Sequence, residues 1–119
     1  IWSDHVLFTK DEVTGVIDLG AMRIDEPATD VARLIGSLEP NSRNNWMAGV
    51  EMYCRLNPRV DTRRVILLDK VSCLLSAVQW LRWLVLERRE FHTSHEDLMK
   101  RWEGFLCRLE SDFWMDLLD

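Results

Sequence analysis

The chain has 119 residues and a mass of 14.1 kDa, the size of one domain or of part of one. Its composition, 47% hydrophobic and 29% charged, is typical of a globular protein and excludes a disordered chain. A net charge of −5 and a pI near 5.2 argue against binding to the phosphate backbone of nucleic acid. Because charges interrupt every long apolar run and no signal-peptide pattern is present, we expect no membrane partner and a cytoplasmic location.

Residues 1–25 carry strand signals. Two short apolar runs, the second rich in β-branched residues, flank four polar residues, a length suited to a hairpin loop. We therefore predict one antiparallel β-hairpin with strands at residues 6–8 and 15–18 around a loop at residues 9–12. Gly15 marks either a bulge or the entry of the second strand.

From Pro27 onward the spacing of apolar residues is helical. A proline suits the first turn of a helix, and apolar residues then recur at three- and four-residue intervals. The pattern predicts a mainly α fold with a short β-hairpin, in a single domain divided into residues 1–25 and a helical subdomain at residues 26–119. The predicted helices are residues 28–38, residues 43–56, a long segment at residues 62–89 that kinks or splits near residues 69–71, and residues 95–117, capped by Ser94 with Asp97.

The chain has three cysteines and six tryptophans. Cys54, Cys73 and Cys107 form no CxxC pair, and an odd number suits no closed disulfide framework. We expect buried free thiols in a reducing compartment. Tryptophans at this frequency indicate core and inter-helix packing, although Trp80 and Trp83 could instead form a cation–π wall.

Four carboxylates and an imidazole lie in or beside the predicted hairpin and the start of the next helix. Carboxylates are the hard oxygen ligands that Mg²⁺ prefers, and residues flanking the strands of a hairpin can converge. Spacing alone leaves two interpretations open, a metal site and a set of solvated loop acids. The five residues are Asp4, His5, Asp18, Asp25 and Asp30.

Three segments of this region resemble the aminoglycoside phosphotransferase-like (choline kinase-like) family. Residues 1–8 read Ile-Trp-Ser-Asp-His-Val-Leu-Phe, residues 13–20 read Val-Thr-Gly-Val-Ile-Asp-Leu-Gly, and residues 26–34 read Glu-Pro-Ala-Thr-Asp-Val-Ala-Arg-Leu. The family pattern there is H-x-D followed by five residues ending in Asn, then V-x-G-x-I-D, then D-P-x-x-D-L-A-R-L. The resemblance implies the C-terminal lobe of a protein-kinase-like fold and ATP-dependent phosphoryl transfer to a small-molecule hydroxyl acceptor.

The resemblance also implies roles for single residues. Asp18 matches the kinase-type DFG aspartate, which holds Mg²⁺ between the phosphates of the nucleotide. His5 occupies the position of the metal-binding Asn of the family; it either ligates a metal or only packs and hydrogen-bonds, with Asp4 or a water completing the shell. Asp30 matches a structural aspartate that holds the backbone of the catalytic loop. Mg²⁺ and ATP are the cofactors expected of the complete enzyme.

By the same resemblance, the catalytic base Asp falls one residue before Ile1, and the nucleotide-binding lobe precedes it. We therefore expect the chain to be the C-terminal portion of a longer phosphotransferase. By itself it should be inactive, bind neither Mg²⁺ nor ATP tightly, and either self-associate or require the missing N-terminal lobe. The alternative is a non-catalytic helical interaction module derived from the same fold.

Overall fold

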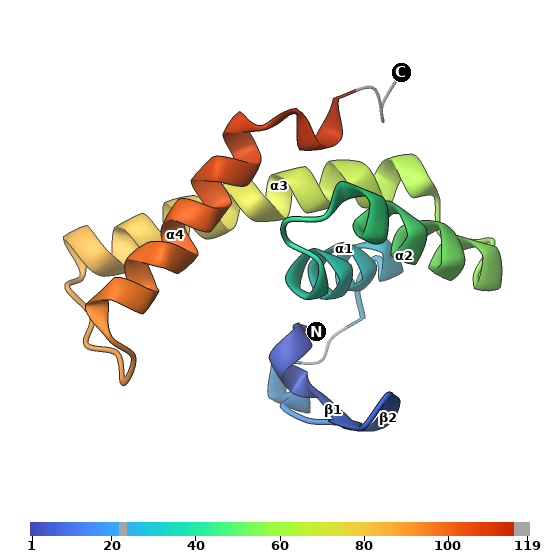
Figure 1. The fold of residues 1–119 in the computed structure, drawn as a ribbon, viewed down its shortest axis with the longest axis horizontal. Helices are drawn as coiled ribbons and strands as arrows, with labels where there is room; N and C mark the ends of the chain where they lie inside the picture. The colour runs from blue at the N-terminus through green and yellow to red at the C-terminus, as the bar shows by residue number, and fades with distance from the viewer. Residues whose placement is uncertain (22–23, 116–119) are drawn as a thin grey trace. The chain divides into compact units, whose positions relative to one another are not determined.

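The computed structural model describes residues 1–21 and 24–115, which are mainly helical with one two-stranded hairpin (Figure 1). This confirms the predicted fold class of helices with a short hairpin. The chain divides into an N-terminal unit, Ile1–Asp69, and a C-terminal unit, Lys70–Asp119. Among the described helices, none is long and apolar enough to cross a membrane. The elements in chain order are η1 (Ser3–His5), β1 (Val6–Thr9), β2 (Glu12–Val16), η2 (Leu19–Ala21), α1 (Pro27–Leu38), α2 (Arg43–Leu56), α3 (Thr62–Leu81), η3 (Arg82–Leu86), α4 (His95–Glu110) and η4 (Asp112–Trp114).

The turn of the hairpin is shorter than the sequence predicts. β1 and β2 pair antiparallel with Thr9 opposite Glu12, so the turn contains only Lys10 and Asp11 instead of four polar residues. Lys10 has a φ of 57°. A positive φ at the first turn residue matches the twist of a two-residue hairpin, and this conformation lets the two flanking polar residues join the strands.

The hairpin contains a bulge. Leu7 lies opposite Gly15, whereas Phe8 lies opposite Val13, and the register shifts between these two pairs. Thr14 is therefore an extra residue on β2 without a counterpart on β1. The bulge lies directly before the glycine at which the sequence indicated one, and β2 ends before the predicted second strand does.

Helices α1 and α2 begin and end where their sequence signals predict. α1 starts at Pro27, whose missing N–H costs nothing in the first turn. α2 is capped by Ser42, whose Oγ accepts a hydrogen bond from the backbone N–H of Asn45 at 3.3 Å.

The core of the N-terminal unit forms where these two helices pack. Trp46 of α2 is fully buried and is the largest side chain of this core. One turn further on, a Cβ at Gly49 would lie 3.2 Å from Ile35 of α1, so the glycine allows the helices to approach closely. The other buried apolar residues of the unit are Ala28, Val31, Ala32, Val50, Val60, Val65 and Ile66.

The third predicted helix differs from the expectation in two places. α3 continues through residues 69–71, where we predicted a kink or a split; the segment holds no proline or glycine to break it. The irregularity comes later, in η3, a π-helical turn in which the N–H of Glu87 donates to the carbonyl of Arg82 at 2.9 Å. The helical segment ends there and not at residue 89, and Arg88 follows with a φ of 49°.

In the C-terminal unit, α4 packs along the second part of α3 (Figure 1). The thiol of Cys73 donates to the carbonyl of Phe105 at 3.5 Å, and the indole N–H of Trp102 donates to the carbonyl of Ala77 at 3.1 Å. The predicted packing role of Trp102 between helices is therefore confirmed. Leu98, Phe113 and Trp114 are buried in the same unit.

The ends of α4 show one prediction confirmed and one wrong. Ser94 Oγ accepts from the N–H of Asp97 at 3.2 Å, which confirms the predicted cap. The Asp97 carboxylate accepts from the Ser94 hydroxyl at 2.6 Å, whereas in a full capping box it would accept from the backbone N–H of the cap residue. The helix ends at Glu110 and not at residue 117, because Ser111 turns to an extended conformation and η4 follows. Residues 116–117 lie outside the described residues.

The three cysteines are free, and their burial differs. Cys73 is buried, as expected for a thiol that faces a neighbouring helix. Cys54 is half-buried. Cys107 is exposed, so the expectation of burial is wrong there: Phe105, not Cys107, lies on the side of α4 that contacts α3.

The α3–η3 segment has an exposed apolar stripe in the C-terminal unit. Val71, Leu74, Val78, Leu81 and Val85 are between 44% and 58% exposed. Their spacing of three and four residues places them on one side of a helix, as in the seam of a coiled coil. Contiguous apolar surface of this kind promotes association between molecules.

We expect the purified chain to self-associate through this apolar stripe. The double variant Leu74→Glu, Val78→Glu should shift the sedimentation-velocity distribution toward the monomer, because two carboxylates would have to be desolvated in the contact. Lys100→Glu changes the net charge by the same amount on an exposed part of α4 and should leave the distribution unchanged. A monomer at every concentration of the unsubstituted chain would contradict this expectation.

Candidate functional site

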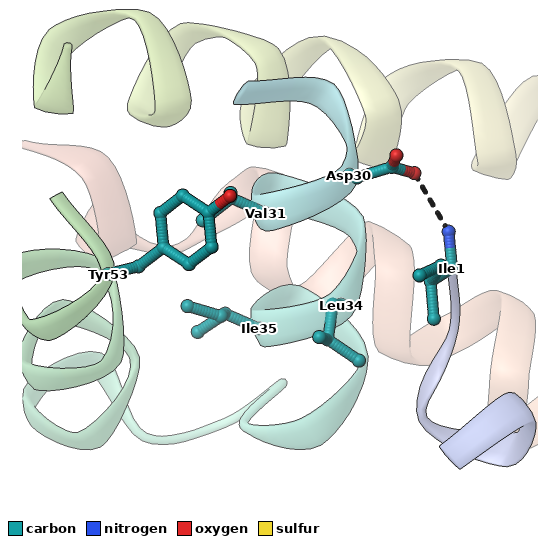
Figure 2. A pocket seen from close by; sticks show the side chains of 6 residues that line it. All are labelled: Ile1, Asp30, Val31, Leu34, Ile35 and Tyr53. Atoms are coloured by element: carbon teal, nitrogen blue, oxygen red, sulfur yellow. Dashed lines mark hydrogen bonds and ion pairs between the residues drawn. The ribbon is translucent and has the colours of Figure 1, made fainter. Parts of the chain in front are cut away.

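One side of α1 holds the first residues of the chain. The amino nitrogen of Ile1 donates to Asp30 Oδ1 at 3.0 Å (Figure 2). Two turns further along α1, Ser37 Oγ accepts from the backbone N–H of Ser3 at 2.8 Å. The Asp30 contact is an ion pair with the terminal ammonium of Ile1, whereas the Ser37 contact holds a backbone amide just ahead of the hairpin. The supporting role of Asp30 in a catalytic loop stays a prediction.

A third contact lies between these two. The guanidinium of Arg33 lies 4.9 Å from the centre of the Trp2 ring, a cation–π contact. Asp30, Arg33 and Ser37 are three and four residues apart, so they share one side of the helix. Sequence reasoning missed the roles of Arg33 and Ser37, although this spacing was visible in the sequence and could have indicated them.

The hairpin brings His5 and Asp18 together. The N–H of His5 donates to the carbonyl of Trp2 at 3.0 Å, and its carbonyl accepts from the N–H of Ile17 at 2.9 Å. His5 thus stands directly before β1, and Asp18 follows β2 at the same end of the hairpin. Nε2 of His5 lies 3.4 Å from Oδ2 of Asp18. The structure therefore places the two predicted metal ligands in contact distance.

The backbone of Asp18 is in the left-handed region, with a φ of 56°. This conformation crowds the Cβ of any residue with a side chain, although aspartate tolerates it better than most. Strained residues of this kind cluster at functional sites, where the surrounding structure holds them. The end of the hairpin beside His5 therefore carries a strained aspartate.

The remaining acids of the predicted cluster do not join this pair. Asp4 Oδ1 lies at 3.5 Å from the hydroxyl of Ser3, and Asp25 Oδ1 accepts from the backbone N–H of Glu26 at 2.8 Å, ahead of α1. Within the described residues, no three side chains of His, Cys, Asp or Glu type form a metal-binding group. The candidate site is therefore a two-residue site of His5 and Asp18.

The donor set of this pair fits a metal ion in part. Mg²⁺ is commonly held by one or two carboxylates, with waters and substrate phosphates completing its shell, so the exposed carboxylate of Asp18 suits it. The imidazole nitrogen of His5 is a donor that first-row transition metals accept more readily. Both side chains reach solvent, which leaves room for ligands from outside the chain.

Comparison with known proteins gives one match. A model of a family described as "phosphotransferase enzyme family" matches residues 1–64, more than half of the chain. The chain belongs to the phosphotransferase enzyme family. The match spans the hairpin, the His5–Asp18 pair, α1 and α2, and it confirms the resemblance to aminoglycoside phosphotransferase-like proteins. No curated protein and no solved structure matches the chain.

A pocket of about 240 Å³ lies beside the Asp30 contact, within the stretch that matches the phosphotransferase family (Figure 2). Its walls are apolar side chains of α1, and Tyr53 of α2 closes one side. Neither His5 nor Asp18 lines it, so the pocket and the His5–Asp18 pair are separate features. Its lining residues are Ile1, Asp30, Val31, Leu34, Ile35 and Tyr53.

The two tryptophans that could form a cation–π wall, Trp80 and Trp83, contact the chain's own residues. Trp80 and Trp83 pack edge to face at 5.4 Å, and Phe91 lies 5.3 Å from Trp80. Arg89 lies 5.0 Å from the centre of the Trp83 ring, and Glu87 accepts from its Nε at 2.6 Å. This arrangement supports the packing interpretation, because the cation on Trp83 is a side chain of the protein.

The left-handed backbone of Asp18 gives a prediction about stability. We expect Asp18→Gly to be about 1 kcal/mol more stable than Asp18→Ala, because only alanine keeps the Cβ that this conformation crowds. Chemical denaturation of the two variants measures the difference, and both lack the carboxylate, so the loss of the contact with His5 cancels. At Thr14, which has no positive φ, the same pair of substitutions should favour alanine. Equal stabilities at position 18 would show that the conformation carries no strain.

Proposed function

We propose that the chain is the C-terminal lobe of a protein-kinase-like enzyme that transfers the γ-phosphoryl group of ATP to a hydroxyl of a small molecule. The observation that carries the proposal is the Asp18 carboxylate, which lies 3.4 Å from His5 at the end of the hairpin. It stands in the V-x-G-x-I-D segment, inside the stretch that matches the phosphotransferase family.

In this proposal the residues of the chain position the reactants. Asp18 would hold the divalent ion through its exposed carboxylate, and His5 would stand beside it as the second contact. When bound, the ion neutralises charge on the nucleotide phosphates during phosphoryl transfer. Asp30 would fix the backbone that leads into the hairpin, beside Ser37, which accepts a hydrogen bond from the backbone N–H of Ser3. Positioning of this kind supplies much of the rate in phosphoryl transfer.

Two further parts would come from outside this sequence. By the resemblance to the family, the aspartate that accepts the proton of the acceptor hydroxyl and the lobe that covers the phosphates would belong to a longer chain. We therefore expect the 119 residues alone neither to hydrolyse ATP nor to phosphorylate an acceptor.

A second candidate function is a non-catalytic helical interaction module. The observation that favours it is the exposed apolar stripe of Val71, Leu74, Val78, Leu81 and Val85, which would suit another helix. The two functions differ in one measurable way, because a module without catalysis would show no ATP turnover in any extended form of the protein.

The test of the proposed function is substitution of Asp18 in a form of the protein extended to include the nucleotide-binding lobe. Asp18→Ala should lower kcat by roughly 10³-fold or more, because loss of the metal contact removes several kcal/mol of charge stabilisation. Asp11→Asn, which removes an exposed carboxylate in the hairpin turn, is the control and should leave kcat unchanged. Unchanged turnover by Asp18→Ala, or no turnover by the unsubstituted extended protein, would contradict the proposal.

A further inference from the structure

The His5–Asp18 pair differs in one donor atom from a site that offers only the oxygen ligands preferred by Mg²⁺. Asp18 contributes an oxygen, but the atom that faces it is Nε2 of the His5 imidazole. Mg²⁺ prefers oxygen ligands and gives up its waters reluctantly, whereas imidazole nitrogen suits the later first-row metals such as cobalt, nickel and zinc. The nature of the second donor therefore bears on which ion the site selects.

The distance between the two atoms allows both to contact one ion. Two donors that each lie about 2.1 Å from a shared ion can be at most about 4.2 Å apart. The observed separation of 3.4 Å lies within that limit. Hydrogen bonds on both sides of the His5 backbone, to Trp2 and to Ile17, keep the imidazole at the end of the hairpin.

Among the residues that the structure describes, no further carboxylate joins the pair to offset the nitrogen. No third Asp, Glu, His or Cys among the described residues completes a metal-binding group with this pair. One of the two side chains that the protein would contribute to such a site is thus an imidazole. In a site with two protein ligands, exchange of one donor type changes the selectivity more than it would in a site with several carboxylates.

We propose that His5 makes the His5–Asp18 pair selective for a first-row transition-metal dication over Mg²⁺. The proposal rests on the proposed function in taking Asp18 as a metal ligand. His5 is in this respect the residue that sets metal specificity, and Asp18 is the residue that provides attraction to any divalent ion.

Metal binding by the 119-residue chain tests the proposal without reference to catalysis. Isothermal titration with Co²⁺ and with Mg²⁺ should give at least about tenfold tighter binding of Co²⁺. His5→Asn should weaken Co²⁺ binding by about tenfold or more and bring the two affinities close together. His92→Asn is the matched control, since His92 lies in the C-terminal unit, and it should leave both affinities unchanged.

A second measurement needs no variant. Substoichiometric Mn²⁺ should broaden the imidazole resonances of His5 before those of His92 and His95, the other two histidines of the chain. Earlier broadening of His92 or His95 would overturn the proposal, and so would equal affinity for Co²⁺ and Mg²⁺ in the unsubstituted chain.

The outcomes separate this proposal from the proposed function. If His5→Asn leaves the ratio of the two affinities unchanged, only the selectivity assigned to His5 is wrong. If Asp18→Asn leaves the affinities for both ions unchanged, Asp18 is not a metal ligand, and the proposed function is contradicted as well.

Discussion

The contacts between α1 and the first three residues are the constraint on which the candidate site depends. Asp30, Arg33 and Ser37 hold the backbone of Ile1, the ring of Trp2 and the backbone of Ser3 respectively. His5 follows immediately, and the hairpin continues from it. A hairpin of two strands is marginally stable alone in water, so its attachment to a packed helix is what gives its open end a defined position.

The arrangement at that end contributes little to folding stability. A solvent-accessible polar contact such as the one between His5 and Asp18 is worth about 0–1 kcal/mol. The left-handed backbone of Asp18 costs about as much, at roughly 1 kcal/mol. Since the two effects nearly cancel, stability alone does not account for this conformation of Asp18. A site that orients a carboxylate toward an imidazole accounts for it more directly.

The sequence predicts those elements whose signals are local. Pro27 marks the start of α1, and the side chains of Ser42 and Ser94 cap the two helices that follow them, so these boundaries agree with the prediction. The proximity of His5 and Asp18 could also be predicted from the sequence, because the two residues flank the strands of one hairpin. Their roles as metal ligands stay predictions.

Features that depend on backbone conformation or on distant neighbours could not be predicted in this way. The two-residue turn depends on a positive φ at Lys10, a residue with no special preference for it. The charged pair Asp69 and Lys70 suggested a break in α3, but Asp69 is buried and the helix continues. Cys107 has apolar neighbours in sequence, yet only the packing of α4 decides which side of that helix is covered.

The bulge at Thr14 has a consequence for the spacing of the functional pair. Beyond the bulge, Val6 lies opposite Val16, and the next hydrogen bond joins Ile17 to His5. If the same sequence continued the pairing of Thr9 with Glu12 without an extra residue, Val16 would face His5, and Asp18 would lie one residue, about 3.3 Å, further along the strand. The extra residue Thr14 therefore acts as a spacer in β2. Whether the side chains of His5 and Asp18 can reach one another depends on the number of residues in this strand as well as on the chemistry of the two residues.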